Sequence, residues 1–163
     1  SALINRIDYG TPLYAKIQPS TWESYVDDIL AKGTSEVGMM TEALYNDTTL
    51  EVCLTTRFKA EKDLTNRNLW WAAFLTESGM VAQQKMPDNS KNPDYVHKHV
   101  LRTSFNGTYG EALTGLELTG STTCTSRSIV LDSGWVSQNC HVVVYVYDED
   151  TKEILQVIET KLE

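Results

Sequence analysis

The stretch from Leu50 to Ala60 constrains the fold more than any other part of the sequence. Leu, Val, Leu, Thr and Phe occupy the even positions from 50 to 58, and Glu, Cys, Thr, Arg and Lys lie between them. Successive side chains of a β-strand point to opposite faces, so this stretch predicts a strand with one face on a core and the other partly in water. Such strands are typical of antiparallel sheets.

One helix is expected before the strands. From Trp22 to Leu30 the apolar residues fall on one face of a helix, and Lys32-Gly33 is a usual helix end. We therefore predict a helix over residues 22–32. The segments that resemble strands are 35–45, 50–60, 69–77, 95–105, 114–119, 122–131, 140–147 and 153–159, with Asp148–Lys152 as a hairpin turn between the last two.

Seven or eight short strands with one helix favour an all-β fold, an antiparallel β-sandwich of Ig-like or jelly-roll type with one N-terminal α-helix. The 163 residues fit one domain. We assign residues 19–163 to the sandwich, with its helix packed across a sheet face or a sandwich end, and residues 1–18 to an arm that leads into it. The side chains expected to point inward are Leu50, Val52, Leu54, Trp70 or Trp71, Phe74, Val142, Val144 and Val146.

Charge and hydropathy exclude two classes of partner. The net charge is −8, and basic residues form no run, so the chain repels phosphate backbones and we expect no nucleic-acid partner. No stretch approaches the roughly 20 apolar residues of a spanning helix, so we expect no direct membrane span. The opening residues 1–6 lack the pattern of a signal peptide, which indicates a mature or excised piece of a longer protein.

The three cysteines, Cys53, Cys124 and Cys140, form no C-x-x-C pair, which argues against a zinc knuckle and a thioredoxin-type motif. Cys53 lies within a predicted strand, where a buried free thiol acts as a small apolar residue, although the alternation places it on the more polar face. Cys124 and Cys140 are therefore the better candidates for a disulfide.

His97 and His99 are two residues apart, so on a strand they point to the same side and H-x-H offers two nitrogens to a metal. A metal centre needs a further ligand to converge on them, and nothing in the spacing of His141 indicates that. We expect no metal and no cofactor, and interpret the pair as ordinary histidines beside a loop. That loop is the polar segment Met80–Asp94, whose length is typical of a functional or mobile loop.

The adjacent Trp70 and Trp71 must face opposite sides of a strand. An exposed tryptophan beside Tyr95 or Tyr109 can stack on a sugar or a partner protein. Packing beneath the predicted helix is the preferred interpretation. The candidate ligand-binding residues are thus Trp70, Trp71, Tyr95, His97 and His99.

No set of catalytic groups emerges from the sequence. There is no C-x-x-C pair, no G-x-S-x-G nucleophile elbow, and no carboxylate pair that differs from the other acidic residues. We therefore predict that the domain has no catalytic residue and is not an enzyme.

Several motifs together resemble a known family. They are NLWWAAFLTE at 68–77, YVHKHVLR at 95–102, the Gly107–Gly110 stretch leading to GEAL, and CHVVVYVYDEDTKEILQV at 140–157. In this order and spacing they resemble the C-terminal domain of the 28-kDa outer membrane protein family, lipoproteins of Gram-negative bacteria. LINR at 3–6 resembles the junction where that family's thioredoxin-like N-terminal domain ends. Lys98 is a departure, because an Asn between the histidines is more typical.

The resemblance implies export to the cell envelope and attachment to the outer membrane by a lipid outside this chain. It implies a non-catalytic interaction domain whose partner is an envelope protein or its own N-terminal domain, bound through strand faces and the Met80–Asp94 loop. One alternative is a carbohydrate-binding module that binds an envelope glycan. Another is an accessory domain of a thioredoxin-like thiol-disulfide oxidoreductase. An oxidising compartment favours a Cys124–Cys140 bridge with Cys53 reduced.

Overall fold

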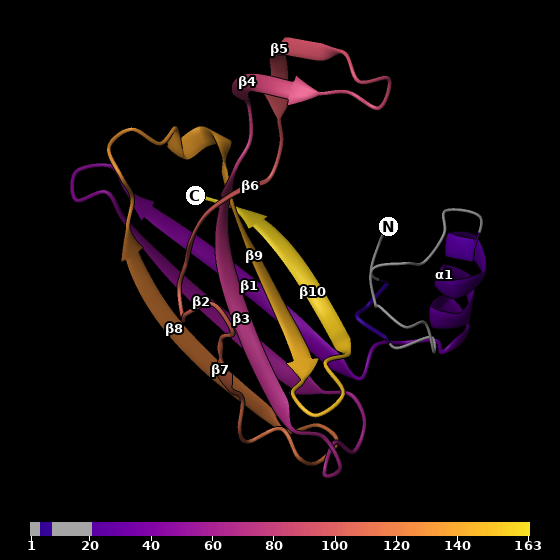
Figure 1. Ribbon diagram of the computed structural model, residues 1–163. Helices are drawn as coiled ribbons and strands as arrows, with labels where there is room; N and C mark the ends of the chain where they lie inside the picture. The colour runs from indigo at the N-terminus through magenta and orange to yellow at the C-terminus, as the bar shows by residue number, and fades with distance from the viewer. Residues whose placement is uncertain (1–3, 8–20) are drawn as a thin grey trace.

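The computed structural model describes residues 4–7 and 21–163 and has the expected architecture, an antiparallel β-sandwich with one N-terminal helix (Figure 1). Two sheets face one another, and a two-stranded hairpin projects from one end. The elements are α1 (Trp22–Ala31), β1 (Val37–Asn46), β2 (Glu51–Ala60), β3 (Leu69–Glu77), β4 (Met80–Lys85), β5 (Lys91–His97), β6 (Val100–Ser104), β7 (Glu111–Ala112), β8 (Thr122–Val130), a short 3-10 helix (Ser137–Asn139), β9 (Cys140–Asp148) and β10 (Ile154–Lys161).

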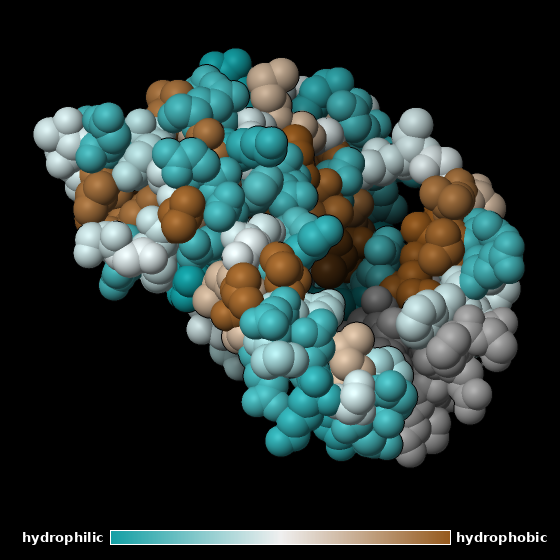
Figure 2. Space-filling view, turned by 90° about the horizontal axis from the view of Figure 1, so that it is seen from above, coloured by the Kyte–Doolittle hydropathy of each residue, from teal (hydrophilic) through white to brown (hydrophobic). Residues whose placement is uncertain are grey.

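Helix α1 forms as predicted, with Lys32 as its C-cap, but its expected packing on the sandwich is wrong. None of its side chains is fully buried: on its apolar face Tyr25 and Ile29 are half-buried, and Trp22, Val26 and Leu30 are exposed. In Figure 2 brown apolar residues lie on the side of α1 that faces the sandwich. An ion pair between Lys32 and Glu153, 3.1 Å long, joins the helix end to the sandwich. No described helix has the length and apolar content needed to cross a membrane.

The arm predicted at residues 1–18 lies mostly outside the described residues. Its described part, residues 4–7, lies against the sandwich. The Asn5 carbonyl accepts a hydrogen bond from the Ile154 N–H, and the Arg6 guanidinium lies 5.1 Å from the ring centre of Tyr145.

The smaller sheet has the order β1-β2-β8. Its middle strand β2 shows the predicted alternation, because Val52, Leu54, Thr56 and Phe58 are buried. The intervening side chains of Cys53 and Arg57 are exposed on the outer face. The prediction of which side chains of this strand point inward is therefore confirmed.

The larger sheet has the order β10-β9-β3-β6, with the short β7 also paired to β3. Its central strand β3 is covered on both faces: Trp71 and Leu75 are buried in the core, and Ala72 and Thr76 are buried on the outer side. The prediction that Phe74 points inward is wrong. Phe74 lies on the outer face and stacks on Tyr145 with ring centres 5.9 Å apart. The prediction failed because a strand that is buried on both faces shows no alternation of apolar and polar residues to indicate its inward face.

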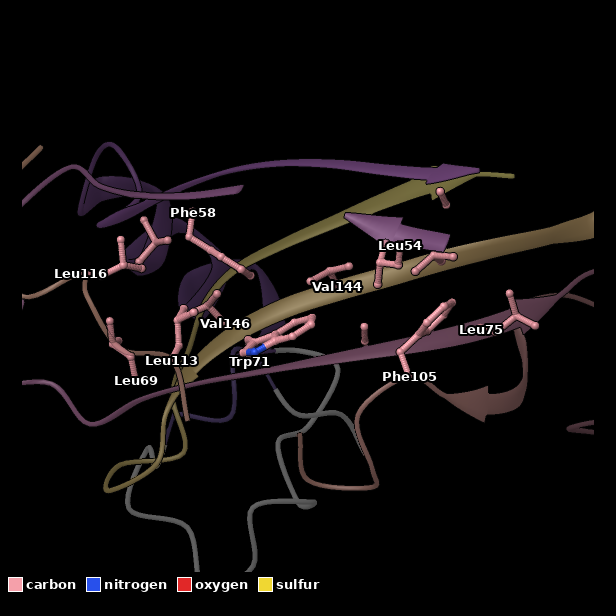
Figure 3. Packing of buried hydrophobic residues seen from close by; sticks show 14 of the residues in the cluster. Leu54, Phe58, Leu69, Trp71, Leu75, Phe105, Leu113, Leu116, Val144 and Val146 are labelled. Atoms are coloured by element: carbon pink, nitrogen blue, oxygen red, sulfur yellow. The ribbon is translucent and has the colours of Figure 1, made fainter. Parts of the chain in front are cut away.

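The core fills the space between the two sheets, as Figure 3 shows. Its largest side chain is Trp71, which is 1% exposed and meets Phe58 of the opposite sheet edge-to-face, with ring centres 5.7 Å apart. Trp71, not Trp70, is thus the inward tryptophan. The other residues predicted to point inward also reach the core: Val52, Leu54, Val142, Val144 and Val146 belong to it, and Leu50 packs against it.

The two sides of the sandwich are closed in different ways. On one side the C-terminal Glu163 exchanges backbone hydrogen bonds with β1, at Ala43 and Tyr45. On the other side Arg127 of β8 pairs with Glu111 of β7. The Arg127 guanidinium also lies 5.8 Å from the ring centre of Trp71, so this one side chain links the edges of both sheets to the core.

Three predicted segments differ from the structure, and the first is the strand expected at 95–105, which is divided between β5 and β6 by a bend at Lys98–His99. The segment 114–119 is a loop, not a strand, although its Leu116 is buried. The Met80–Asp94 loop is instead most of the β4–β5 hairpin, whose turn lies at Met86–Ser90. Solvent covers both faces of this hairpin, so its sequence has no apolar alternation to indicate strands.

The core predicts a sharp contrast between two leucines of the smaller sheet. Leu54 is fully buried, whereas Leu44 of the neighbouring strand is 50% exposed. Leu54→Ala should lower the free energy of unfolding by about 2 to 5 kcal/mol, because it leaves a cavity between the sheets. Leu44→Ala should change it by less than about 0.5 kcal/mol. Urea denaturation of both variants measures this, and equal losses would contradict the placement of the core.

Candidate functional site

The projecting hairpin is a continuation of the β3–β6 pair. Glu77 pairs with Val100 below the point where the hairpin leaves the sheet, and Met80 pairs with His97 above it, in the same register. The two strands are therefore bent out of the sheet together without a change of partner. We call the bend at Ser78–Gly79 and Lys98–His99 the neck.

The neck depends on two residues with left-handed backbone. Gly79 has φ +83° and His99 has φ +51°. A side chain at Gly79 would also crowd the Asn139 amide, 3.2 Å from an added Cβ, so glycine suits this position. The strained His99 backbone is held by a hydrogen bond of 3.0 Å that its N–H donates to Ser78 Oγ. The Gly79 N–H donates to the His97 carbonyl across the neck.

Below the neck, Glu77 joins three segments. Its buried carboxylate accepts a 2.7 Å hydrogen bond from Arg102 of β6 and a 3.0 Å hydrogen bond from the Val136 N–H. The Arg102 guanidinium lies 5.5 Å from the ring centre of Trp135 in the same loop as Val136. Glu77 thereby fixes the base of the hairpin to β6 and to the loop before β9.

His97 and His99 do not point to the same side, so the expected H-x-H geometry is wrong. His97 lies at the end of β5 and packs edge-to-face on Tyr95, 4.9 Å between ring centres. His99 turns back to the larger sheet, where its Nε2 lies 3.1 Å from Glu159 Oε1 and its ring is 6.2 Å from that of His141. The left-handed backbone of His99 causes this divergence. Within residues 4–7 and 21–163, no three His, Cys, Asp or Glu side chains gather as metal ligands.

The hairpin exposes apolar side chains on both faces. On one face Val81 and Val96 are direct cross-strand partners and are 63% and 50% exposed. On the other face Ala82 lies opposite Tyr95, next to the Met80–His97 pair. Figure 2 looks down on this end of the molecule, where brown apolar residues lie among teal polar ones. A shallow hollow of about 450 Å³ near the tip is lined by Gln84, Lys85, Met86, Pro87 and Tyr95.

Neither tryptophan forms an exposed binding platform, and neither packs beneath α1. Trp71 is in the core. Trp70 is partly buried on the outer face of the larger sheet, where its ring lies 6.5 Å from that of Tyr147. Burial and hydrogen bonding to Glu149 raise the pKa of Tyr147 to about 12. Of the five candidate residues, the structure brings Tyr95 and His97 together on the hairpin and places His99 at its neck.

The expected Cys124–Cys140 bridge is not formed, and all three cysteines are free thiols. Cys124 is exposed on β8 of the smaller sheet, whereas Cys140 is buried at the start of β9 in the larger sheet. The loop between the strands joins the far end of β8 to Cys140, so the two residues lie at opposite ends of the sandwich. Burial, reinforced by the charge of Glu77, raises the pKa of the Cys140 thiol to about 11.

Sequence reasoning missed Glu77, Arg102 and Trp135. One signal for Glu77 was present, because a carboxylate at the end of the apolar run 69–76 must either leave the sheet or find a cation. Its partner Arg102 follows after the whole hairpin, so no spacing rule connects the two residues.

The environments of the cysteines predict their reactivity. At pH 8, below the raised pKa of Cys140, that thiol stays protonated and buried, so a thiol reagent should react with Cys53 and Cys124 first. Labelling of the native protein should therefore show two fast thiols, and the unfolded, unreduced protein should show three. A total of one would establish a disulfide and contradict the free thiols described here.

The Glu77 contacts predict a large effect of a small change. Glu77→Gln removes the negative charge that Arg102 faces, and hydrogen bonds to charged groups contribute about 1.5 to 3 kcal/mol. We expect a loss of that size in the free energy of unfolding, measured by urea denaturation. Glu42→Gln on the exposed face of β1 is the matched control and should change little. Equal stability of the two variants would show that Glu77 does not anchor the neck.

Comparison with solved structures shows the same fold in two proteins of Porphyromonas gingivalis. The crystal structure of a domain of the outer membrane lipoprotein Omp28 matches 79% of this chain and 89% of its own, with 23% identity and a TM-score of 0.57. HBP35 matches 96% of this chain with 15% identity and a TM-score of 0.74. The match covers 50% of HBP35, so the chain spans about half the length of that protein.

Sequence comparison assigns the family. No curated protein matches the chain. The family described as "Outer membrane protein Omp28", however, matches residues 1–163, which is the whole chain. The fold of the Omp28 domain from Porphyromonas gingivalis agrees with this match. The chain therefore belongs to the Omp28 family of outer membrane proteins.

Proposed function

We propose that this chain is a non-catalytic interaction domain of the cell envelope that binds another envelope protein through the β4–β5 hairpin. The observation that carries the proposal is the exposed Val81–Val96 pair on a hairpin that projects from the sandwich. The intact protein is held at the outer membrane by a lipid attached outside this chain.

The energetics of the hairpin support a binding role. A two-stranded hairpin is marginally stable in water by itself, and this one gains no packed face from the sandwich. The neck holds it through its shared register with β3 and β6 and through Glu77 below it. The apolar faces of the hairpin would be buried only against a partner, and exposed apolar surface on a projecting element is typical of an interaction site.

The chemistry of the hairpin favours a protein partner over a glycan. Sugar platforms rely on exposed aromatic rings, but Trp71 is in the core and Trp70 is partly buried. Tyr95, the aromatic residue of the hairpin, is 37% exposed but lies as a single ring against His97, with no second aromatic ring of the hairpin to form a platform. The aliphatic pair Val81 and Val96 suits an apolar protein surface or an added strand.

The buried polar groups support a non-catalytic role. Glu77 is neutralised by Arg102, and the raised pKa of Cys140 keeps its thiol from acting as a nucleophile at neutral pH. Each of these groups has a structural partner: Glu77 binds Arg102 and the Val136 N–H, and the Cys140 thiol donates to the Val136 carbonyl.

The test is binding of the labelled chain to outer-membrane vesicles of its source organism. The double variant Val81→Ser with Val96→Ser should weaken binding at least about tenfold, because burial of each valine contributes about 1.5 kcal/mol or more. Val157→Ser is the matched control, since Val157 is a similarly exposed strand valine on β10. It should bind like the parent.

Treatment of the vesicles separates the partner classes. Protease digestion should abolish binding, and periodate oxidation of sugars should leave it intact. The opposite result would support the carbohydrate alternative. Parent and double variant binding equally, or a parent that does not bind at all, would overturn the role of the hairpin.

A further inference from the structure

Strand β8 is an open edge of the smaller sheet. The hydrogen bonds Leu131 N–H to Leu50 carbonyl and Ala60 N–H to Ser121 carbonyl show that the odd-numbered residues of this segment bond to β2. The even-numbered residues, from Thr122 to Val130, therefore point their backbone groups away from the sheet. Among the described residues, these outward groups receive one hydrogen bond, from the Arg127 side chain to the Ser126 carbonyl.

This edge lacks the usual protection against strand pairing. Natural edges are short, bulged, interrupted by proline or charged. Strand β8 has nine residues, pairs with β2 without a register shift, and contains no proline. Its one charged residue, Arg127, contacts Glu111 and Trp71 and also donates a hydrogen bond to the Ser126 carbonyl, so its charge does not extend beyond the edge. The outward residues are small and neutral: Thr122, Cys124, Ser126, Ser128 and Val130.

We propose that β8 pairs with β8 of a second copy of this chain, antiparallel, with the two-fold axis at Ser126. The result is a continuous six-stranded sheet, β1-β2-β8 from one copy followed by β8-β2-β1 from the other. The contact is separate from the hairpin and does not depend on its function.

The register follows from the strand itself. Pairing centred on Ser126 is the arrangement that uses all nine residues of β8. It matches even with even positions, as the outward hydrogen bonds require. Cys124 then faces Ser128 of the second copy, and Arg127 faces Thr125, so no like charges oppose one another across the new ladder.

Two features favour a second copy over a foreign strand. The first is self-complementarity, because a regularly paired strand of this length, whose outward side chains are all neutral, fits its own antiparallel copy under two-fold symmetry. The second is that the assembly ends at two copies. The other edge of the smaller sheet, β1, already bonds to Glu163, so no further copy adds there to form a fibre. An interface of one strand per copy is small, which implies a weak, reversible dimer.

The first test measures mass by analytical ultracentrifugation at about 0.15 M salt, which screens the net charge of −8 beyond about 8 Å. The parent at concentrations on the order of 100 µM should show a monomer–dimer equilibrium. Ser126→Pro removes an outward N–H and spares the β2 ladder, so it should abolish dimers at an unchanged fold. Ser126→Ala keeps the N–H and should dimerise like the parent.

The second test detects the proposed register by a disulfide between the two copies. It remains informative even if Ser126→Pro does not fold. In a Cys53→Ser background, Ser128→Cys should form a disulfide with Cys124 of the second copy, since paired Cα atoms lie about 5.5 Å apart. Oxidised glutathione accepts the two electrons as the thiols lose their protons. Cys53 is replaced because it lies opposite Ser128 within one copy. Thr122→Cys in the same background is the off-register control and should give no covalent dimer.

The proposal is supported if Ser128→Cys forms a covalent dimer, Thr122→Cys forms none, and the parent dimerises without a covalent bond. A monomeric parent at the highest concentration would overturn it. So would a dimer that forms equally with Ser126→Pro, because the contact would then lie elsewhere. Cross-linking of Thr122→Cys and Ser128→Cys to the same extent would overturn the register.

Discussion

Trp71 is the side chain on which the fit of the two sheets depends. It extends from the central strand of the larger sheet, meets Phe58 of the smaller sheet edge-to-face, and lies under the guanidinium of Arg127. The Trp71 indole thus fills the space between the two sheets and provides the ring that the Arg127 side chain of β8 contacts. Because Arg127 also pairs with Glu111, the same contact draws the edges of both sheets together.

The strand that carries Trp71 also positions the hairpin. Trp71, Leu75 and Glu77 lie on the same, inward face of β3, so the strand is held in the core along its length and ends on a buried carboxylate. Glu77 then binds Arg102 and the Val136 N–H at the point where the chain leaves the sheet. The direction in which the hairpin projects is therefore determined by the core and not by the exposed strands themselves.

The sequence predicted most of the sandwich, because its strands bury one face and their alternation is visible. β2 is the clearest case. Prediction failed where that signal was absent: Phe74 lies in a strand covered on both faces, and β4 and β5 have solvent on both faces. The site was less predictable. Tyr95 and His97 were candidates, but Arg102 meets Glu77 only through the fold, and the left-handed backbone of His99 reversed the expected H-x-H geometry.

The register that continues across the neck, from the Glu77–Val100 pair to the Met80–His97 pair, has a consequence for how the chain folds. If β4 and β5 pair first around the Met86–Ser90 turn, the loop that separates β3 from β6 shrinks roughly fourfold, which lowers its closure entropy cost by about 1.2 kcal/mol. Hairpins form within microseconds, so strand pairing can extend from the β4–β5 hairpin through the neck and bring β6 next to β3 in the correct register. The surface proposed to meet a partner in the finished protein would thus serve earlier as the template for one edge of the larger sheet.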